Sequence, residues 1–73
     1  MGKWVISNNI RKLRFSHDEM TQQQLAEKVG VTRQTIVAIE KGNYSPSLEL
    51  AFRIALAFNV PLEEVFSIEE EGA

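Results

Sequence analysis

The spacing of apolar residues changes along this chain and predicts its secondary structure. At positions 25–39, and again at 48–58, apolar residues recur every three or four positions, as they do in helices that bury one face. Positions 4–6 and 65–68 are short apolar runs with the composition of strands. We therefore expect helices in the middle of the chain and an antiparallel pair of strands from its ends. Such a two-stranded sheet is marginally stable unless helices pack beneath it.

Residues 22–41 carry the most informative pattern, QQQLAEKVGVTRQTIVAIEK, which predicts two helices separated by a short break. Gly30 lies where the chain leaves the first helix, commonly through a left-handed conformation that only Gly adopts without strain. Thr32 can then cap the second helix with its hydroxyl. The apolar residues of both helices fall where two steeply crossing helices bury them against each other. This segment is therefore predicted to be a helix-turn-helix.

Several residues are typical of helix starts. Thr21 followed by Gln24 fits a capping box, in which each side chain bonds the backbone amide of the other residue. Ser47 suits the cap of a later helix, and Pro61 suits the first position of a short final helix. With a basic helix beginning near Ile10, these signals predict five helices.

The helix expected after Ser47 is apolar on nearly all sides. Within 48–58, only Glu49 and Arg53 are clearly polar. A helix of this composition is normally buried all round, so we expect it at the centre of the core. Contact with a second subunit is the alternative role for part of its surface.

The residues that open the second helix of the 22–41 pattern indicate a ligand. Arg33 pairs well with guanine and Gln34 with adenine, both at base edges in the major groove of DNA. For Arg33, a phosphate contact or plain solvation is the alternative. We expect DNA binding, with residues 33–40 as the recognition helix.

Neighbouring residues suit the DNA backbone or thymine methyl groups. Gln22 begins a helix, where backbone amides and the helix dipole attract a phosphate. Val37 and Ala38 are placed to meet thymine methyls, although Val37 also suits packing. The threonines near the start of the recognition helix either cap it or bind phosphate, and the polar residues after it are placed to contact the DNA backbone. The complete set of candidate DNA-binding residues is Gln22, Thr32, Arg33, Gln34, Thr35, Val37, Ala38, Lys41, Asn43 and Tyr44.

Length and composition exclude several classes of function. The 73 residues predict a single domain, 1–73, without room for a separate ligand-sensing module. The absence of Cys excludes disulfides and thiolate metal sites. No nucleophile–base pair, phosphate-binding glycine loop or metal cluster is evident, so we expect no enzyme, no cofactor and no small-molecule ligand. Without a run of about 20 apolar residues or a signal-peptide pattern, we expect a soluble cytoplasmic protein with no membrane contact.

The charge is unevenly distributed, which changes how the net charge of −2 is interpreted. Residues 1–62 hold all 8 Lys and Arg with 5 acidic residues, a net charge of +3. Residues 63–73 hold the other 5 acidic residues and no basic one, a net charge of −5. An acidic segment that points away from DNA is compatible with DNA binding. We expect 69–73 to be a solvated, frayed tail.

Residues from about 10 to 66 resemble the Cro/repressor-type (XRE-like) helix-turn-helix family. The strongest similarity lies in TQQQLAEKVGVTRQTIVAIEKG and in the following YSPSLELAFRIALAFNVPLEEVF. The resemblance implies an all-α, five-helix, lambda-repressor-like domain whose third helix lies in the major groove. It further implies a prokaryotic transcription regulator, usually a repressor, that binds near-palindromic operators as a homodimer and associates with the nucleoid. The family often pairs an arginine of the first helix with the glutamate that ends the recognition helix, which here implies an Arg14–Glu40 ion pair.

A homodimer is the expected working form, because one recognition helix contacts only a few base pairs. Two copies related by a twofold axis reach successive major grooves about 34 Å apart. The candidate interface residues are Trp4, Leu62, Val65 and Phe66, for which the monomer core is the alternative. The competing functions are an antitoxin-like protein that binds a toxin and represses its own operon, and a protein-interaction module without DNA binding.

Overall fold

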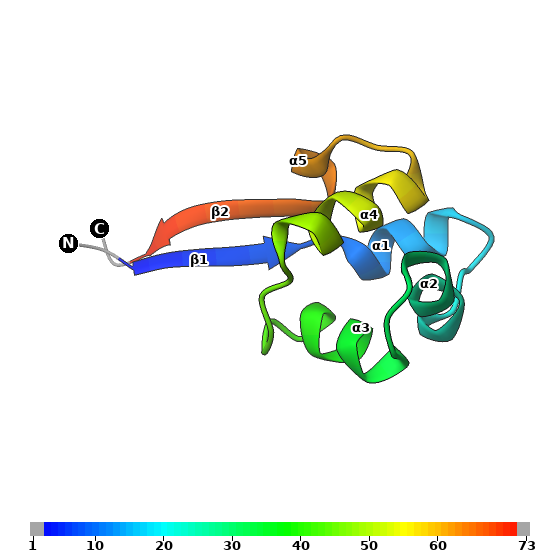
Figure 1. Cartoon of the computed structure of the whole chain (residues 1–73). Helices are drawn as coiled ribbons and strands as arrows, with labels where there is room; N and C mark the ends of the chain where they lie inside the picture. Colours follow the sequence, from blue (N-terminus) through cyan, green and yellow to red (C-terminus); the bar gives the residue numbers. More distant parts are fainter. Residues whose placement is uncertain (1–2, 72–73) are drawn as a thin grey trace.

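The computed structural model describes residues 3–71, which form a five-helix body with a two-stranded ribbon projecting from one side (Figure 1). The molecule is elongated by this ribbon and measures 39 × 21 × 20 Å along its principal axes. In chain order, the elements are β1 (Lys3–Asn8), α1 (Ile10–Ser16), α2 (Gln22–Val29), α3 (Arg33–Glu40), α4 (Leu48–Phe58), α5 (Leu62–Val65) and β2 (Phe66–Glu71).

The core lies where the five helices meet. Its side chains are aliphatic apart from Phe58 and Met20, which fits a small body without disulfides. All five helices contribute to it, and α2 and α3 pack directly against each other. The largest fully buried side chains are Ile10, Leu25, Ile36, Ile39, Ile54, Phe58 and Val65.

The N-caps predicted from the sequence are present at the starts of α2, α3 and α4. The hydroxyl of Thr21 accepts from the amide of Gln24 at 3.0 Å, and the Gln24 side chain accepts from the Thr21 amide at 2.9 Å. Ser47 caps α4 by accepting from the Leu50 amide at 3.1 Å. Gly30 ends α2 with φ of +80°, the left-handed conformation expected there. The boundaries of the helix-turn-helix are therefore set by local side-chain chemistry.

The terminal segments pair antiparallel, as predicted, but the ribbon is longer than expected. Ile6 faces Ile68 and Trp4 faces Glu70 across the two strands. Val65, predicted to begin a strand, is instead the last residue of α5 and is fully buried. The Asn9 amide donates to the Val65 carbonyl at 2.8 Å. This bond joins the residue before α1 to the last residue of α5, and the ribbon leaves the body there.

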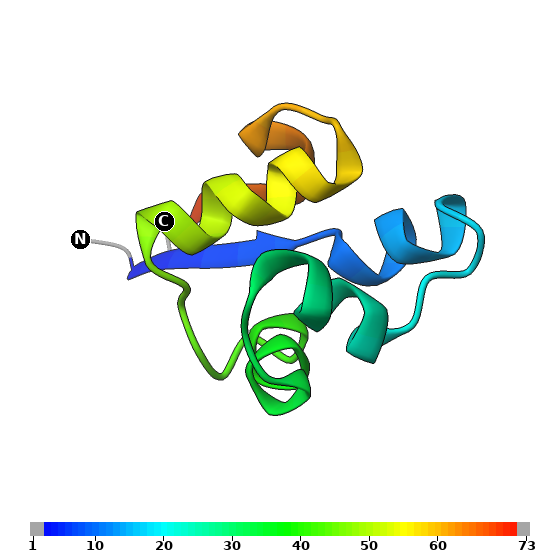
Figure 2. The same cartoon turned by 45° about the vertical axis from the view of Figure 1, so that its right-hand side comes forward.

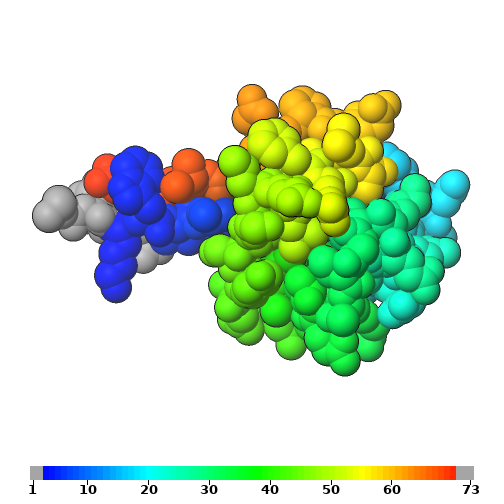
Figure 3. All heavy atoms as spheres, in the orientation of Figure 1, coloured from blue at the N-terminus to red at the C-terminus, as the bar shows by residue number. Residues whose placement is uncertain are grey.

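The small sheet expected from the two ends of the chain is present, with six residues in each strand, so the term all-α fits the helical body but not the whole fold. One expectation for the terminal segments is wrong. Residues 69–71 belong to β2 rather than to a frayed tail, because their backbone pairs with residues 3–5 of β1. Positions 72 and 73 of the expected tail lie outside the described residues. The helices do not lie beneath the outer part of the ribbon, which stands clear of the body (Figure 3).

The expectation that α4 is buried on all sides is also wrong. One face of the helix, including Ile54 and Phe58, is buried in the core. The other face has Leu48, Phe52 and Leu56 exposed, because α4 lies at the surface with α2 and α5 packed against only part of it. The uninterrupted apolar composition of this helix is thus not explained by the core of a single chain.

Candidate nucleic-acid interface

The recognition helix buries one face and presents the other to solvent. Ile36 and Ile39 of α3 are buried in the core, which fixes the rotation of the helix about its axis. Arg33 and Gln34, at its first turn, are exposed, and Val37 and Ala38 are half-buried. The two residues predicted to contact base edges are therefore free of contacts that would occlude them.

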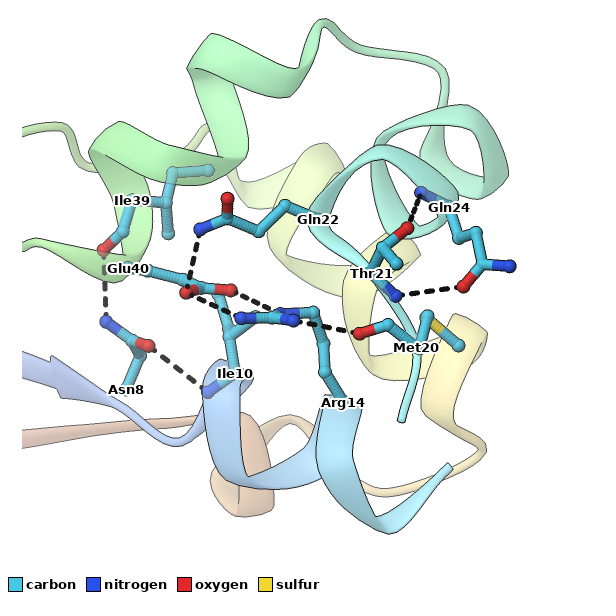
Figure 4. A network of polar contacts seen from close by, with 9 residues as sticks. All are labelled: Asn8, Ile10, Arg14, Met20, Thr21, Gln22, Gln24, Ile39 and Glu40. Carbon is cyan, nitrogen blue, oxygen red and sulfur yellow. Dashed lines mark hydrogen bonds and ion pairs between the residues drawn. The ribbon is translucent and has the colours of Figure 1, made fainter. Parts of the chain in front are cut away.

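The last residue of α3 is fixed by a buried ion pair (Figure 4). Nε of Arg14 donates to Oε2 of Glu40 at 2.7 Å, and Nη2 donates to Oε1 at 3.1 Å. The two side chains are only 9% and 10% exposed. Nη1 of Arg14 also donates to the Met20 carbonyl at 2.8 Å, so the guanidinium is bonded on all three nitrogens. This confirms the pair implied by the family resemblance and joins α3 to α1 and to the loop before α2.

Gln22 and Asn8 extend this network around the end of α3 (Figure 4). Nε2 of Gln22 donates to Oε1 of Glu40 at 3.2 Å. An amide group has two N–H donors, so one remains for a phosphate. Nδ2 of Asn8 donates to the Ile39 carbonyl at 3.0 Å, while its Oδ1 accepts from the Ile10 amide at 3.1 Å. The network thus connects α1, α2, α3 and the base of the ribbon, and it sets the position of Gln22 relative to the recognition helix.

A shallow groove runs between α1, α2 and α3 and gathers part of the predicted site. Gln22, Arg33 and Lys41 line it together with Arg11 and Val37. The Arg14 charge is neutralised by Glu40, whereas Arg11, Arg33 and Lys41 are exposed cations. Glu19 also lines the groove, but the three exposed cations leave it a net positive charge, which suits a phosphate backbone.

Sequence reasoning missed Arg11 and Gln23, both of which line this groove. The Arg11 guanidinium lies over the Phe15 ring, 5.5 Å from its centroid, which restrains a long side chain that is otherwise exposed. The basic character of α1 was visible in the sequence. Its placement beside α3 was not, because that depends on how α1 packs across the body.

The remaining candidates lie outside the groove. The hydroxyl of Thr32 accepts from the Thr35 amide at 3.3 Å and lies 3.0 Å from the Thr35 hydroxyl, so both threonines take part in capping α3. Asn43 and Tyr44 are exposed in the turn after α3, and the Asn43 amide donates to the Ala38 carbonyl at 2.9 Å. These two residues are accessible but are not gathered with Gln22 and Arg33.

The candidate dimer-interface residues differ in how far they are exposed. Val65 is fully buried, and its assignment to an interface is wrong because its side chain has no surface to offer a second chain. Leu62 and Phe66 are half-buried and pack against the core. Trp4 is 67% exposed on the ribbon.

Residues 3–71 show neither a cluster of metal-ligating side chains nor a membrane-spanning helix. This part of the chain contains no group of three or more His, Cys, Asp or Glu side chains arranged to bind a metal ion. None of its helices has the length and apolar composition needed to cross a membrane.

Comparison with known proteins agrees with this geometry. A helix-turn-helix family model matches residues 10–65. An uncharacterized helix-turn-helix transcriptional regulator of Methanocaldococcus jannaschii is 50% identical over 66 residues, which span 90% of this chain and 98% of that protein. The transcriptional repressor of the cryptic phage CTXphi in Vibrio cholerae is 38% identical over 90% of this chain and 59% of its own length. Antitoxin PezA of Streptococcus pneumoniae is 38% identical over 84% of this chain and 38% of its own length.

The fold itself has a counterpart among solved structures. The crystal structure of a Bacteroides fragilis protein named as DNA-binding superposes with a TM-score of 0.74 at 24% identity, covering 86% of this chain and all of that one. The match of the family model to most of the chain, and the identity to regulators of nearly the same length, decide the assignment. The chain belongs to the Cro/repressor-type (XRE-like) helix-turn-helix family of transcriptional regulators.

Proposed function

We propose that this protein is a sequence-specific repressor that binds a near-palindromic operator as a homodimer, with α3 in the major groove. One observation carries the proposal: Arg33 and Gln34 are exposed at the start of a helix whose other end is fixed by the Arg14–Glu40 pair. A rigid helix with free polar side chains at its leading end is what base-edge recognition requires.

In this proposal the contacts divide into two classes. Gln34 pairs with an adenine and Arg33 with a guanine or a phosphate, which supplies sequence preference. Arg11, Gln22 and Lys41 line the adjacent groove and contact phosphates, which supplies affinity and orientation but little sequence preference. Neither class involves catalysis, and we infer a cytoplasmic, nucleoid-associated binding protein without a cofactor or enzymatic activity.

Repression follows from occupancy of the operator. A dimer bound over a promoter excludes RNA polymerase without any further activity. The similarity to a phage transcriptional repressor along 90% of this chain supports repression over activation.

The base-contact assignment is tested with Gln34→Ala on an operator selected from random duplexes. The variant loses one bidentate base contact in each half-site, each worth about 1–3 kcal/mol, so we expect the operator Kd of the dimer to rise by at least about 30-fold in fluorescence anisotropy. The variant should select sites with a relaxed preference at one position in each half-site. Lys28→Ala is the control, because it removes a charge from α2 outside the groove. Equal affinities for the parent and the Gln34 variant would contradict the proposal.

The phosphate assignment has its own test. Arg11→Ala should weaken binding to operator and random DNA alike and should lower the slope of log Kd against log salt by about 2, because the dimer loses one phosphate contact in each subunit. An Arg11 variant with an unchanged salt slope would exclude this residue from the phosphate contacts.

An antitoxin-like role is the second candidate, favoured by the similarity to antitoxin PezA over 84% of this chain. In that role the same DNA-binding surface represses the operon while a toxin occupies another surface. Co-expression with the product of the adjacent gene, followed by size-exclusion chromatography, distinguishes the two functions. A stable complex with that product favours the antitoxin-like role.

A further inference from the structure

The two faces of the ribbon differ in polarity. The register places Trp4, Ile6 and Ile68 on one face, which we call the apolar ribbon face, and Glu70 borders them opposite Trp4 near the outer end of the ribbon. Each of these side chains is about half exposed or more, and Ile68 is 58% exposed. The opposite face carries Lys3, Val5, Ser7, Ser67 and Glu69. An amphipathic ribbon normally packs its apolar face on another layer, yet no layer of the described residues covers this one.

A second exposed apolar surface lies on α4. Leu48, Phe52 and Leu56 follow one another at four-residue spacing, so they form a single stripe, here called the α4 stripe. Leu56 is 77% exposed. In Figure 1 the first turns of α4 lie near the base of the ribbon, whereas in Figure 2 they lie in front of its outer part. The described residues thus leave two apolar surfaces uncovered, one on the ribbon and one on α4.

The combined area is large for a chain of this size. The exposed fractions of these six side chains correspond to an area on the order of 700 Å², and each partner in a standard stable interface contributes about 800 Å². The largest apolar patch on a typical monomer is about 300–600 Å².

We propose that a second copy of this chain covers the apolar ribbon face and the α4 stripe, so that these six residues form the dimer interface. The inference rests on the homodimer of the proposed function and names the surface that makes it. Each copy offers a projecting apolar ribbon and an apolar helix stripe. In a twofold arrangement the ribbon of one copy packs on the stripe of the other, and the reciprocal contact forms at the same time.

Charge and shape favour a second copy over other occupants. Glu69 and Glu70 lie on the same ribbon and repel nucleic acid and anionic lipid. The ribbon projects from the body, and the Asn8 bond to the Ile39 carbonyl fixes its base to α3. An identical chain supplies an apolar surface of matching extent.

The experiment measures the mass of DNA-free protein by sedimentation equilibrium over a range of concentrations. We expect the parent to sediment as twice the chain mass of 8.3 kDa. Ile6→Ser on the ribbon and Leu56→Ser on the helix should each raise the dimer dissociation constant at least tenfold. Val5→Ser is the matched control, because it makes the same kind of change at the neighbouring position on the other face of β1. Its dissociation constant should equal that of the parent.

Ile6→Ser could weaken the dimer by disordering the ribbon itself. Leu56→Ser does not have this problem, because Leu56 is an exposed position of α4 and is not part of the ribbon. A parent that stays monomeric at all concentrations would overturn the inference, as would a dimer that tolerates both substitutions or is equally weakened by Val5→Ser. The measurement uses DNA-free protein, so it tests the interface separately from DNA binding. A dimer with no operator affinity contradicts the DNA-binding function and leaves this interface standing. A monomer that binds the operator contradicts the homodimer and this interface and leaves DNA binding standing.

Discussion

The five-helix body and the β1–β2 ribbon differ in how far their apolar side chains are buried. In the body, aliphatic residues such as Leu25 and Ile54 are completely buried among one another. In the ribbon, Trp4, Ile6 and Ile68 share one face and remain exposed. The body therefore gains its stability from contacts within one chain. The ribbon has the composition of a packed element, but the described residues do not pack on its apolar face, and the proposed dimer interface would supply that packing.

The polar groups differ in the same way. Every buried side-chain nitrogen and oxygen of the described residues has a hydrogen-bond partner, and those around Glu40 join several elements. The ribbon has one side-chain bond between its strands, from Ser7 to Ser67 at 2.7 Å, and that bond is exposed. Changes to the body should therefore alter the stability of the monomer, whereas changes to the ribbon should alter association.

The largest expected effect comes from breaking the buried ion pair with Arg14→Ala. The substitution leaves the Glu40 carboxylate buried without its charge partner, which costs about 3–5 kcal/mol of unfolding free energy. Chemical denaturation followed by circular dichroism measures the loss. Arg11→Ala, an exposed position of the same helix, is the control and should cost under about 1 kcal/mol. Similar losses for the two variants would show that the pair does not stabilise the body.

A smaller loss is expected from Gly30→Val. Gly30 has φ of +80°, and an added Cβ would lie 3.7 Å from the Arg53 side chain, an ordinary contact. The cost therefore comes from backbone strain, about 1–3 kcal/mol for a β-branched residue in a left-handed conformation. Thermal unfolding should show a lowered Tm for Gly30→Val and a smaller decrease for Gly30→Asn, because Asn tolerates positive φ. Equal Tm values for Gly30→Val and the parent would contradict this account.

His17→Phe tests a contact that closes the end of the body. The ring nitrogens of His17 lie 2.9 Å from the Leu13 carbonyl and 3.1 Å from the Phe58 carbonyl. Phenylalanine keeps an aromatic ring next to Phe58 but removes both polar contacts, which we expect to cost about 1–2 kcal/mol. Urea denaturation measures the change. A variant as stable as the parent would assign the role of His17 to ring packing alone.

The smallest change in global stability is expected from diluting the unmodified protein. Dilution should nevertheless increase the difference in hydrogen exchange between the ribbon and the helical body. Below the dimer dissociation constant, the ribbon amides should exchange with solvent almost freely, because a two-stranded sheet alone is marginally stable. The amides of α2 and α3 should keep the protection that the core gives them. Hydrogen exchange followed by NMR measures both regions in one sample. Ribbon protection that does not depend on concentration would show that the ribbon is stable within one chain.

Much of the helical body was predictable because its signals are local. Thr21 with Gln24 marked the start of α2, Gly30 marked its end, and Ser47 marked the start of α4. Each signal depends on backbone and side-chain geometry within a few residues, so it can be recognised without knowing the fold. The exposed positions of Arg33 and Gln34 also followed from the helical period, since the apolar residues of α3 occupy its other face.

The errors concern residues whose environment is set by distant parts of the chain. Val65 has the composition of a strand or an interface residue, and only the packing of α5 places it in the core. The stripe with Leu56 has the composition of a core helix, yet it lies at the surface because α4 has neighbours on only part of its circumference. Composition cannot distinguish a core from an uncovered interface, because both require the same side chains.

The sequence by itself determined where the helices of this protein begin, which face of each is apolar, and which polar side chains open the recognition helix. These properties follow from hydrogen bonds and periodicity over one or two turns. Only the tertiary structure decided that Arg11 lies beside the recognition helix and that residues 69–71 extend a ribbon. It also decided that the apolar surfaces of the ribbon and α4 lack cover within one chain. The physical reason is that burial depends on which elements meet, and contacts between residues far apart in the chain determine those meetings.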